Sequence, residues 1–255
     1  MVQLGLFLFH PDQSADLFRF ARDYIRDLPD DCGVFLAGLS APPAPFVPTE
    51  LHFTPAFGLV VVGLGDELSH AQLIAPIRQA LEPLVEMVTP IPYAGLQQMF
   101  NESAPWGIYS YEKPVYLHDL TDGAIEVILE HQAKKMSPLS FVPIFVMGGA
   151  FEKADPNSSA FGGARDIGYV VNISATTPSP DDFAAEREWA RNYWPALVEH
   201  AVGVGGYVNF MNEQETERVR SAYGEKYARL QKIKAAYDPN NLFHLNANIE
   251  PDAQA

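Results

Sequence analysis

Apolar residues in the first third of the chain change their spacing in a regular order. Residues 2–9 are almost all apolar, which predicts a strand buried on both faces. Residues 12–28 carry apolar side chains at i, i+3 and i+4 spacing, which predicts an amphipathic helix. Residues 32–39 and 57–65 predict two more strands, and residues 68–85 predict a second helix. The order is therefore strand, helix, strand, strand, helix.

The same order returns in the middle of the chain. Strands are predicted at residues 108–117, 139–148 and 167–175, with a helix at residues 122–136 between the first two. Thr121 is a candidate N-cap for that helix. The sequence Ser179-Pro180-Asp181-Asp182 then begins a last helix, because it combines a cap, an early proline and acids at the positive end of the dipole.

The two stretches predict a single sheet. Residues 2–85 and 108–202 each have the order of a ferredoxin-like βαββα unit, by topology and not by repeated residues. We expect them to form one large, mainly antiparallel sheet with helices on one face, an α+β fold. The five prolines of residues 41–55 predict a surface loop or an irregular edge. A short helix is expected near residues 93–100.

The C-terminal fifty residues follow a different pattern. After the glycines of residues 203–206, residues 207–210 are expected to be extended, and helices are predicted at residues 213–222 and 225–236, hinged at Gly224. Asp238-Pro239 stops the last helix. The apolar residues after that stop lie in a segment too short to fold alone, so we expect it to dock on a larger body; they are Leu242, Phe243, Leu245 and Ile249.

This tail, KIKAAYDPNNLFHLNANI, preceded by Tyr207-Val208-Asn209, resembles the C-terminal signature of the berberine bridge enzyme-like family of FAD-linked oxidases. The resemblance extends over nearly the whole chain but is dense only in the last fifty residues. It implies a substrate-binding α+β domain at residues 1–205 and a berberine bridge enzyme-like C-terminal segment at residues 206–255.

The resemblance also implies a cofactor and a partner. Family members bind FAD largely through an N-terminal flavin-binding domain, which we expect to be absent from this chain and supplied as a separate domain or subunit. The implied reaction is hydride transfer between a small organic or sugar-like substrate and FAD. The isolated chain is then expected to be catalytically inactive.

Charge and composition exclude several other functions. The 32 acidic and 17 basic residues give a net charge of −15, which argues against nucleic acid or anionic membranes as partners. No apolar run reaches 18 residues, and no signal peptide is visible, so a cytoplasmic protein is expected. The seven histidines lack metal-ligand spacing, and Cys32 is the only cysteine, so no metal site is predicted.

Tyr207 is the candidate catalytic residue. If residues 207–209 form a strand, Tyr207 and Asn209 point to the same side, where a phenol and an amide suit the edge of a flavin. The resemblance therefore implies that Tyr207, Asn209 and Asn246 of the tail contact the cofactor. The simpler interpretation of Tyr207 is a half-buried aromatic residue whose hydroxyl bonds to the backbone.

Two positions at which relatives carry a general base are apolar here. Many relatives have tyrosine where this chain has Phe210, and several have an ionisable group in the strand that contains Phe145. Another residue acts as the base, or the substrate needs none, or activity has been lost, or the enzyme is a reductase. Phe145, Tyr169 and Phe210 are predicted to bind substrate, although Asn172 and Ser174 on the strand of Tyr169 are also candidates.

A second hypothesis comes from a different class of protein. Open sheets of ferredoxin-like units hold small ligands or dimerise, so the chain is alternatively a non-catalytic small-molecule-binding or dimerising module. The docking tail distinguishes the two hypotheses, because a free-standing module needs no such segment.

Overall fold

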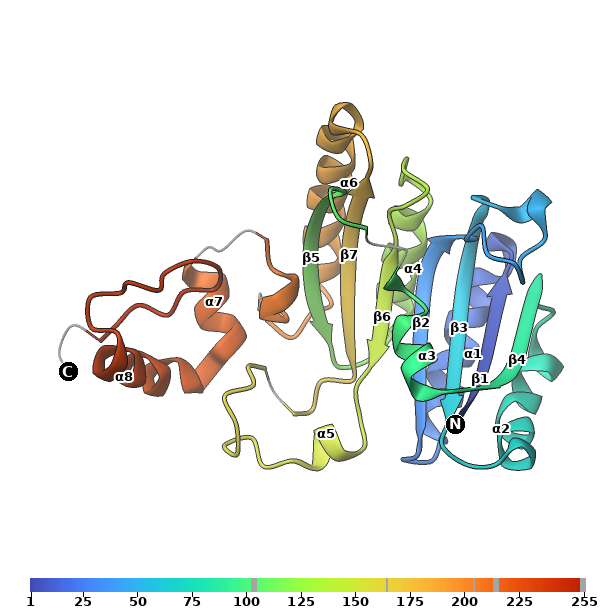
Figure 1. Cartoon of the computed structure of the whole chain (residues 1–255), viewed down its shortest axis with the longest axis horizontal. Coiled ribbons are helices and arrows are strands. Elements are labelled where there is room, and N and C mark those ends of the chain that lie inside the picture. The colour runs from blue at the N-terminus through green and yellow to red at the C-terminus, as the bar shows by residue number, and fades with distance from the viewer. Residues whose placement is uncertain (102–104, 164, 204, 213–215, 253–255) are drawn as a thin grey trace.

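One antiparallel sheet of seven strands organises the computed structural model, in the order β4-β1-β3-β2-β6-β7-β5 (Figure 1). The structure describes residues 1–101, 105–163, 165–203, 205–212 and 216–252. The strands are β1 (Val2–Phe9), β2 (Cys32–Ser40), β3 (Pro55–Gly63), β4 (Val85–Ile91), β5 (Tyr109–Leu117), β6 (Val142–Val146) and β7 (Tyr169–Thr177).

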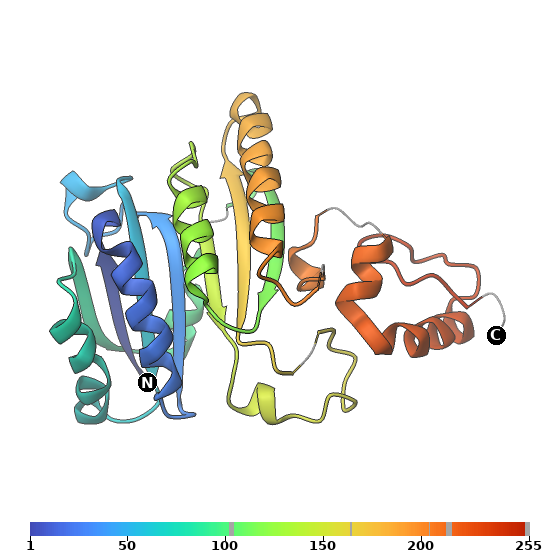
Figure 2. The same ribbon diagram turned by 180° about the vertical axis from the view of Figure 1, so that it is seen from behind.

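The predicted pair of units is confirmed. β1, β2 and β3 alternate with α1 (Ser14–Arg26) and α2 (Glu67–Ala80), and β5, β6 and β7 alternate with α4 (Asp122–Gln132) and α6 (Pro180–Val198). The units join where β2 pairs with β6, with Phe35 opposite Phe145. Figure 2 shows the four helices side by side on one face of the sheet, as the α+β prediction required.

The last strand of the first unit was missed by the sequence analysis. The predicted helix at residues 68–85 ends at Ala80, because Leu81 is already extended, with φ −140° and ψ 151°. β4 follows and pairs with β1 at the sheet edge. An edge strand tolerates Pro90, which cannot donate a backbone hydrogen bond.

The N-termini of α4 and α6 are capped by the residues that the sequence predicts. The Thr121 hydroxyl accepts the Ala124 N–H at 3.2 Å and begins α4, as predicted. The Ser179 hydroxyl accepts the Asp181 N–H at 3.2 Å and begins α6. α6 runs without a break through Pro195.

The opposite side of the sheet, called here the open face, is partly covered by the chain itself. Over β1, β3 and β4, the loop of residues 41–55 packs onto the sheet with Ala41 and Val47 buried, and α3 (Tyr93–Gln98) lies beside it. Apolar side chains such as Leu4 and Leu6 explain this cover. The loop therefore covers the part of the open face formed by β1, β3 and β4, and is not only a surface connection.

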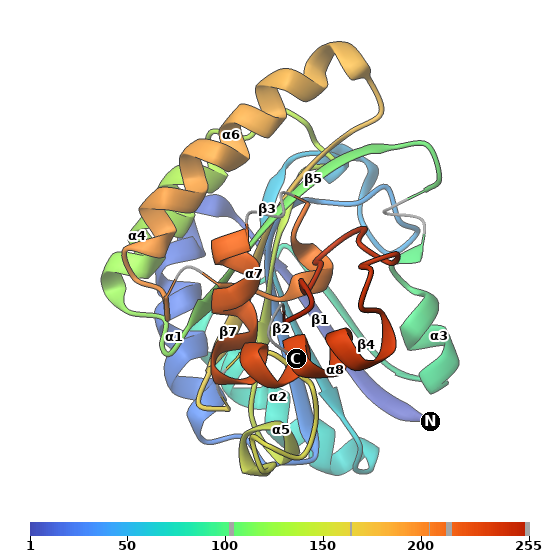
Figure 3. The same cartoon turned by 90° about the vertical axis from the view of Figure 1, so that its left-hand side faces the viewer.

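The C-terminal segment forms a small body beside β5 (Figures 1 and 3). It contains α7 (Thr216–Tyr223) and α8 (Tyr227–Tyr237), joined by a turn in which Gly224 has φ +54°. The first three residues of the helix predicted at residues 213–222 lie outside the described residues. Its own core consists of Met211, Val219, Ala222 and Tyr227, against which Ala247 and Ile249 of the tail pack.

Candidate functional site

A row of aromatic rings crosses the uncovered part of the open face. Phe35 of β2 and Phe145 of β6 are cross-strand partners, with ring centroids 5.4 Å apart. Phe145 stacks on Phe210 at 5.9 Å, and Phe210 meets Tyr207 edge-on at 5.1 Å. Phe161 continues the row 6.2 Å beyond Tyr207. We call these five residues the aromatic row; together they make a broad apolar wall for a planar or ring-shaped ligand.

Tyr207 and Asn209 meet, as predicted, but through different backbone geometry. Val208–Phe210 form a 3-10 turn and not a strand, because the Phe210 N–H donates to the Tyr207 carbonyl at 2.9 Å. The Asn209 side-chain amide donates to the Tyr207 hydroxyl at 2.7 Å. Tyr207 is half-buried and Asn209 is exposed, so this phenol–amide pair stands at the surface of the open face.

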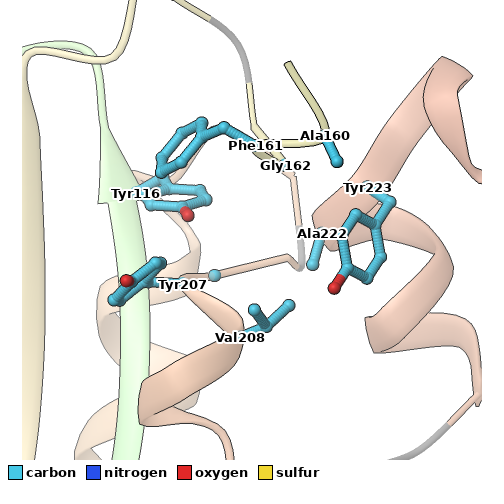
Figure 4. Close-up of a pocket in the computed structure, with 9 residues that line it drawn as sticks. Tyr116, Ala160, Phe161, Gly162, Tyr207, Val208, Ala222 and Tyr223 are labelled. Carbon is cyan, nitrogen blue, oxygen red and sulfur yellow. The ribbon is translucent and has the colours of Figure 1, made fainter. Parts of the chain in front are cut away.

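A cavity of about 190 Å³ adjoins the aromatic row between β5 and α7 (Figure 4). Its phenolic lining comes from Tyr116, Tyr207 and Tyr223, and Phe161 and Val208 close its sides. Burial, together with the neighbouring Tyr207 and Tyr223 hydroxyls, raises the pKa of Tyr116 far above its ordinary value. Tyr116 therefore stays protonated at neutral pH and can donate a hydrogen bond into this space.

A polar cluster on the same face joins the candidates Asn172 and Ser174 to Glu112, which the sequence analysis did not identify. Asn172 and Ser174 of β7 face Pro114 and Glu112 of β5. The Ser174 hydroxyl lies 3.4 Å from the Glu112 carboxylate, and the Ser110 hydroxyl lies 3.5 Å from it. Burial raises the pKa of Glu112, and hydrogen bonds from Asn172, Ser174 and Ser110 oppose that rise. A carboxylate is thus held in a partly dry site.

The alternation of side chains along β5 is the sequence signal that could have identified Glu112. Tyr111 and Lys113 are buried on the helix-covered side, where they pack near Trp194 and Arg191 of α6. Glu112, between them, must point to the open face. The strand order was also needed, since it places β5 beside the β7 residues that bind Glu112.

The expectation for Tyr169 is corrected. Tyr169 lies in the main core on the helix-covered side. Burial raises its pKa to about 12; nearby Asp119 adds to this rise, and Arg26 and Arg22 of α1 oppose it. A substrate on the open face cannot reach this side chain. Asn172 and Ser174, the other two candidates on this strand, face the open side of β7 together with Val170 and Thr176.

Two further residues lie at the margins of the site, Arg165 and the predicted cofactor contact Asn246. Arg165 is clamped between the rings of Phe151 and Phe161, at 4.8 and 5.2 Å, which is a structural cation–π contact. Asn246 is exposed in the tail with φ +61°, so its amide is available to a neighbouring molecule.

The open face fits one side of a flavin ring system. An isoalloxazine is planar and aromatic and carries hydrogen-bonding edges, which the aromatic row and the exposed Asn209 amide complement.

For metals, the described residues include no group of three or more His, Cys, Asp or Glu side chains placed to hold an ion. Within the same residues, no helix is both long and apolar enough to cross a membrane.

Comparisons with known proteins agree with this geometry. Residues 206–250 match the family model "Berberine and berberine like". The chain is 27% identical over 214 residues to an FAD-linked oxidoreductase of Dictyostelium discoideum and 26% identical over 215 residues to the FAD-linked oxidoreductase YgaK of Bacillus subtilis. These alignments cover 80% and 81% of this chain but 46% and 45% of the relatives, so the chain spans about half their length.

Solved structures show the same fold at low identity. Wild-type berberine bridge enzyme-like 1 of Physcomitrella patens superposes with a TM-score of 0.81 at 15% identity, over 98% of this chain and 54% of that one. For 6-hydroxy-D-nicotine oxidase of Arthrobacter nicotinovorans the TM-score is 0.76 at 19% identity, again over 98% and 54%. A chitooligosaccharide oxidase gives 0.74 at 17%, over 99% and 56%. The resemblance inferred from the tail is confirmed.

Proposed function

We propose that this chain, which resembles FAD-linked oxidoreductases of the berberine bridge enzyme-like family, forms the substrate domain and C-terminal segment of such an enzyme. Residues 1–205 form the substrate wall, and residues 206–255 join that wall to a flavin-binding domain or subunit that holds most of the FAD. The family match at residues 206–250 and the shared fold support this proposal.

The exposed apolar tail is the observation that carries the proposal. Leu242, Phe243 and Leu245 are 72%, 76% and 81% exposed, although they lie in a built turn and not in a loose end. The Asp238 carboxylate accepts the Leu242 and Phe243 N–H groups at 2.7 and 3.0 Å. An ordered turn that presents neighbouring large apolar side chains is typical of an interaction surface. The flavin-binding domain is the partner that the family relationship supplies.

The chemistry proposed is hydride transfer with a small organic or sugar-like substrate. FAD, when bound, supplies the acceptor or donor of the hydride. In this proposal the aromatic row, through Phe145 and Phe210, packs the substrate and excludes water from it. Tyr207 and Asn209 stand nearest the cofactor and hold it by hydrogen bonds, with Asn246 of the tail as a further contact.

A reconstitution experiment tests the proposal. The chain is purified alone and together with a flavin-binding domain of the family supplied as a separate polypeptide, and FAD retention is followed by absorbance and fluorescence. We expect the two polypeptides to associate and FAD to be retained stoichiometrically only when both are present. Leu242→Ser with Phe243→Ser should abolish association, whereas Leu68→Ser, which changes a residue 70% exposed on α2, should leave it intact. Tight FAD binding by the chain alone would contradict the domain assignment.

One observation favours the second candidate function, a non-catalytic binding module. Phe145 and Phe210, at both positions where relatives carry a base, stack on each other and offer no ionisable group. In this alternative the same wall holds a small molecule without oxidising it. A reconstituted pair that retains FAD but whose flavin is never reduced by a library of alcohols, amines and sugars would favour the module over the oxidoreductase.

A further inference from the structure

Glu112 is the one carboxylate that the sheet presents to its open face. All residues of the seven strands are described, and the strand registers fix which side each residue faces. Of the two other acidic or basic residues in these strands, Glu86 is opposite Phe7, which lies in the main core on the helix-covered side, and Lys113 is opposite Ile173, which lies there too. The rest of the open face on β1, β3 and β2 is apolar.

The surroundings of Glu112 are built to hold its carboxylate in place. Asn172 is 3% exposed and hydrogen-bonds Glu112, while its own side-chain oxygen has no partner among the described residues. Ser174, 1% exposed, contacts both Glu112 at 3.4 Å and the Thr176 hydroxyl at 3.2 Å. The Glu112 main-chain N–H is fixed as well, since it donates to the Asn212 side chain at 2.5 Å.

The cluster around Glu112 has an excess of hydrogen-bond acceptors over donors and cations. Both the Glu112 carboxylate and the Asn172 side-chain oxygen are hydrogen-bond acceptors, and within the described residues no cation forms an ion pair with Glu112. A buried acceptor that lacks a donor costs about 1–3 kcal/mol, so such a group is normally satisfied by a donor. The cluster is therefore suited to a ligand that brings a hydrogen-bond donor.

The position of the cluster fits a ligand on the aromatic row. Phe145 is opposite Val170 on β7, and Asn172 is two residues along the same strand and the same face, at a separation of about 7 Å. A molecule packed on Phe145 and Phe210 can thus extend a polar group toward Glu112. Asn172 and Ser174 act here as positioning residues, and Glu112 is the residue that the ligand contacts.

We propose that Glu112 is the recognition site for a hydrogen-bond donor of the substrate, an alcohol hydroxyl or an amine N–H, and that Asn172 and Ser174 orient its carboxylate. The inference deepens the proposed function, on which it rests, by naming the residue that selects donor-bearing substrates. It assigns a role to a side chain that lies outside the Tyr207–Asn209 pair and outside the two apolar base positions.

NMR measurement of ligand binding to the isotope-labelled chain tests this assignment in the absence of flavin. The probes are methyl β-D-glucoside for the hydroxyl source and piperidine hydrochloride for the amine source, with the fully O-methylated glucoside and N,N-dimethylpiperidinium as analogues that lack the donor. The readout is the carboxyl carbon resonance of Glu112 and the side-chain amide resonance of Asn172. We expect at least one donor-bearing probe to shift both signals and its donor-free analogue to shift neither.

Matched variants separate recognition from non-specific contact. Glu112→Gln should weaken binding of the active probe about tenfold, whereas Glu126→Gln, at an exposed position of α4, should leave it unchanged. Asn172→Leu should preserve part of the affinity but alter the pKa of Glu112. Equal shifts by probe and analogue, equal binding by Glu112→Gln, or no shift up to the solubility limit of both probes would overturn the proposal. If these failures accompany normal association with a flavin-binding domain, the assignment of Glu112 fails alone, and the proposed function stands.

Discussion

Phe145 and Phe210 stack on each other with ring centroids 5.9 Å apart and an interplanar angle of 21°. They come from residues 65 positions apart and occupy the two places where a general base was sought. Their contact converts both places into one apolar surface at the centre of the aromatic row. Any proton acceptor of this protein must therefore lie elsewhere, and Glu112 is the carboxylate on the same face.

The aromatic row should stabilise the fold through Phe145. Phe145→Ala removes contacts with both Phe35 and Phe210, so it should lower the free energy of unfolding by about 2–3 kcal/mol, less than for a fully buried phenylalanine. Urea denaturation measures the change. Phe243→Ala, at a side chain 76% exposed, should change stability by less than about 0.5 kcal/mol. Equal losses in the two variants would show that the row contributes nothing.

Tyr207→Phe tests the phenol–amide pair. The substitution removes the acceptor of the Asn209 amide at 2.7 Å while keeping the ring contacts, so stability should fall by only about 0.5–1 kcal/mol. In the reconstituted pair the same change should reduce the rate of flavin reduction. Tyr237→Phe, at a tyrosine 88% exposed, is the control and should affect neither quantity.

Glu186 of α6 should be a strong structural residue. It is 1% exposed and accepts the Met136 and Ser137 N–H groups at 2.7 and 2.5 Å and the Ser140 hydroxyl at 2.5 Å. Glu186→Ala leaves the Met136 and Ser137 N–H groups without an acceptor, while the Ser140 hydroxyl keeps the Thr176 carbonyl at 3.2 Å, and we expect a loss of about 3 kcal/mol or more in chemical denaturation. Glu188→Ala, at an exposed position two residues along α6, should be nearly neutral. A small effect of Glu186→Ala would mean that water replaces the carboxylate.

Glu112 should make stability depend on pH in a defined direction. Burial raises its pKa in the folded state, so its contribution is fully present below the pKa of an unfolded glutamate, about 4.3, and is lost as pH rises through the folded pKa. Glu112→Gln cannot ionise, and its stability relative to the parent chain should increase over that range. Thermal unfolding at a series of pH values measures this, with an expected gain of about 1–3 °C at neutral pH. A difference that stays constant with pH would contradict the burial effect, and Glu126→Gln serves as the control.

The shape of the tail should depend on Lys234 and Asp238. The Lys234 ammonium bonds the Asp238 carboxylate and the Phe243 carbonyl, both at 2.5 Å. The hydrogen bond from Lys234 lowers the pKa of Asp238, so this contact is present above the pKa of an unfolded aspartate and is lost as pH falls through the lower folded value. Lys234→Ala should accelerate amide exchange at Leu242 and Phe243. Lys232→Ala, at an exposed residue of the same helix, should not.

The sequence by itself determined the repeated unit and the tail. Hydrophobic spacing is local, and so the switch from strand to helix periods identified both βαββα units, and Asp238-Pro239 identified the end of α8. The tail residues that were expected to dock, such as Leu242 and Phe243, are indeed the ones left exposed. Ile249 was expected to behave in the same way, but it packs on the small core of the C-terminal segment.

Only the tertiary structure decided which side of each strand faces the site. Alternation shows that Tyr169 and Asn172 point to opposite sides of β7, but not which side the helices cover, because that depends on strand order and on packing between distant segments. For the same reason β4, an edge strand that pairs with β1, could not be recognised from the local sequence. The role of Glu112 likewise followed only from its position beside Asn172 and Ser174. Local periodicity fixes elements, whereas a site is made by residues that the fold brings together.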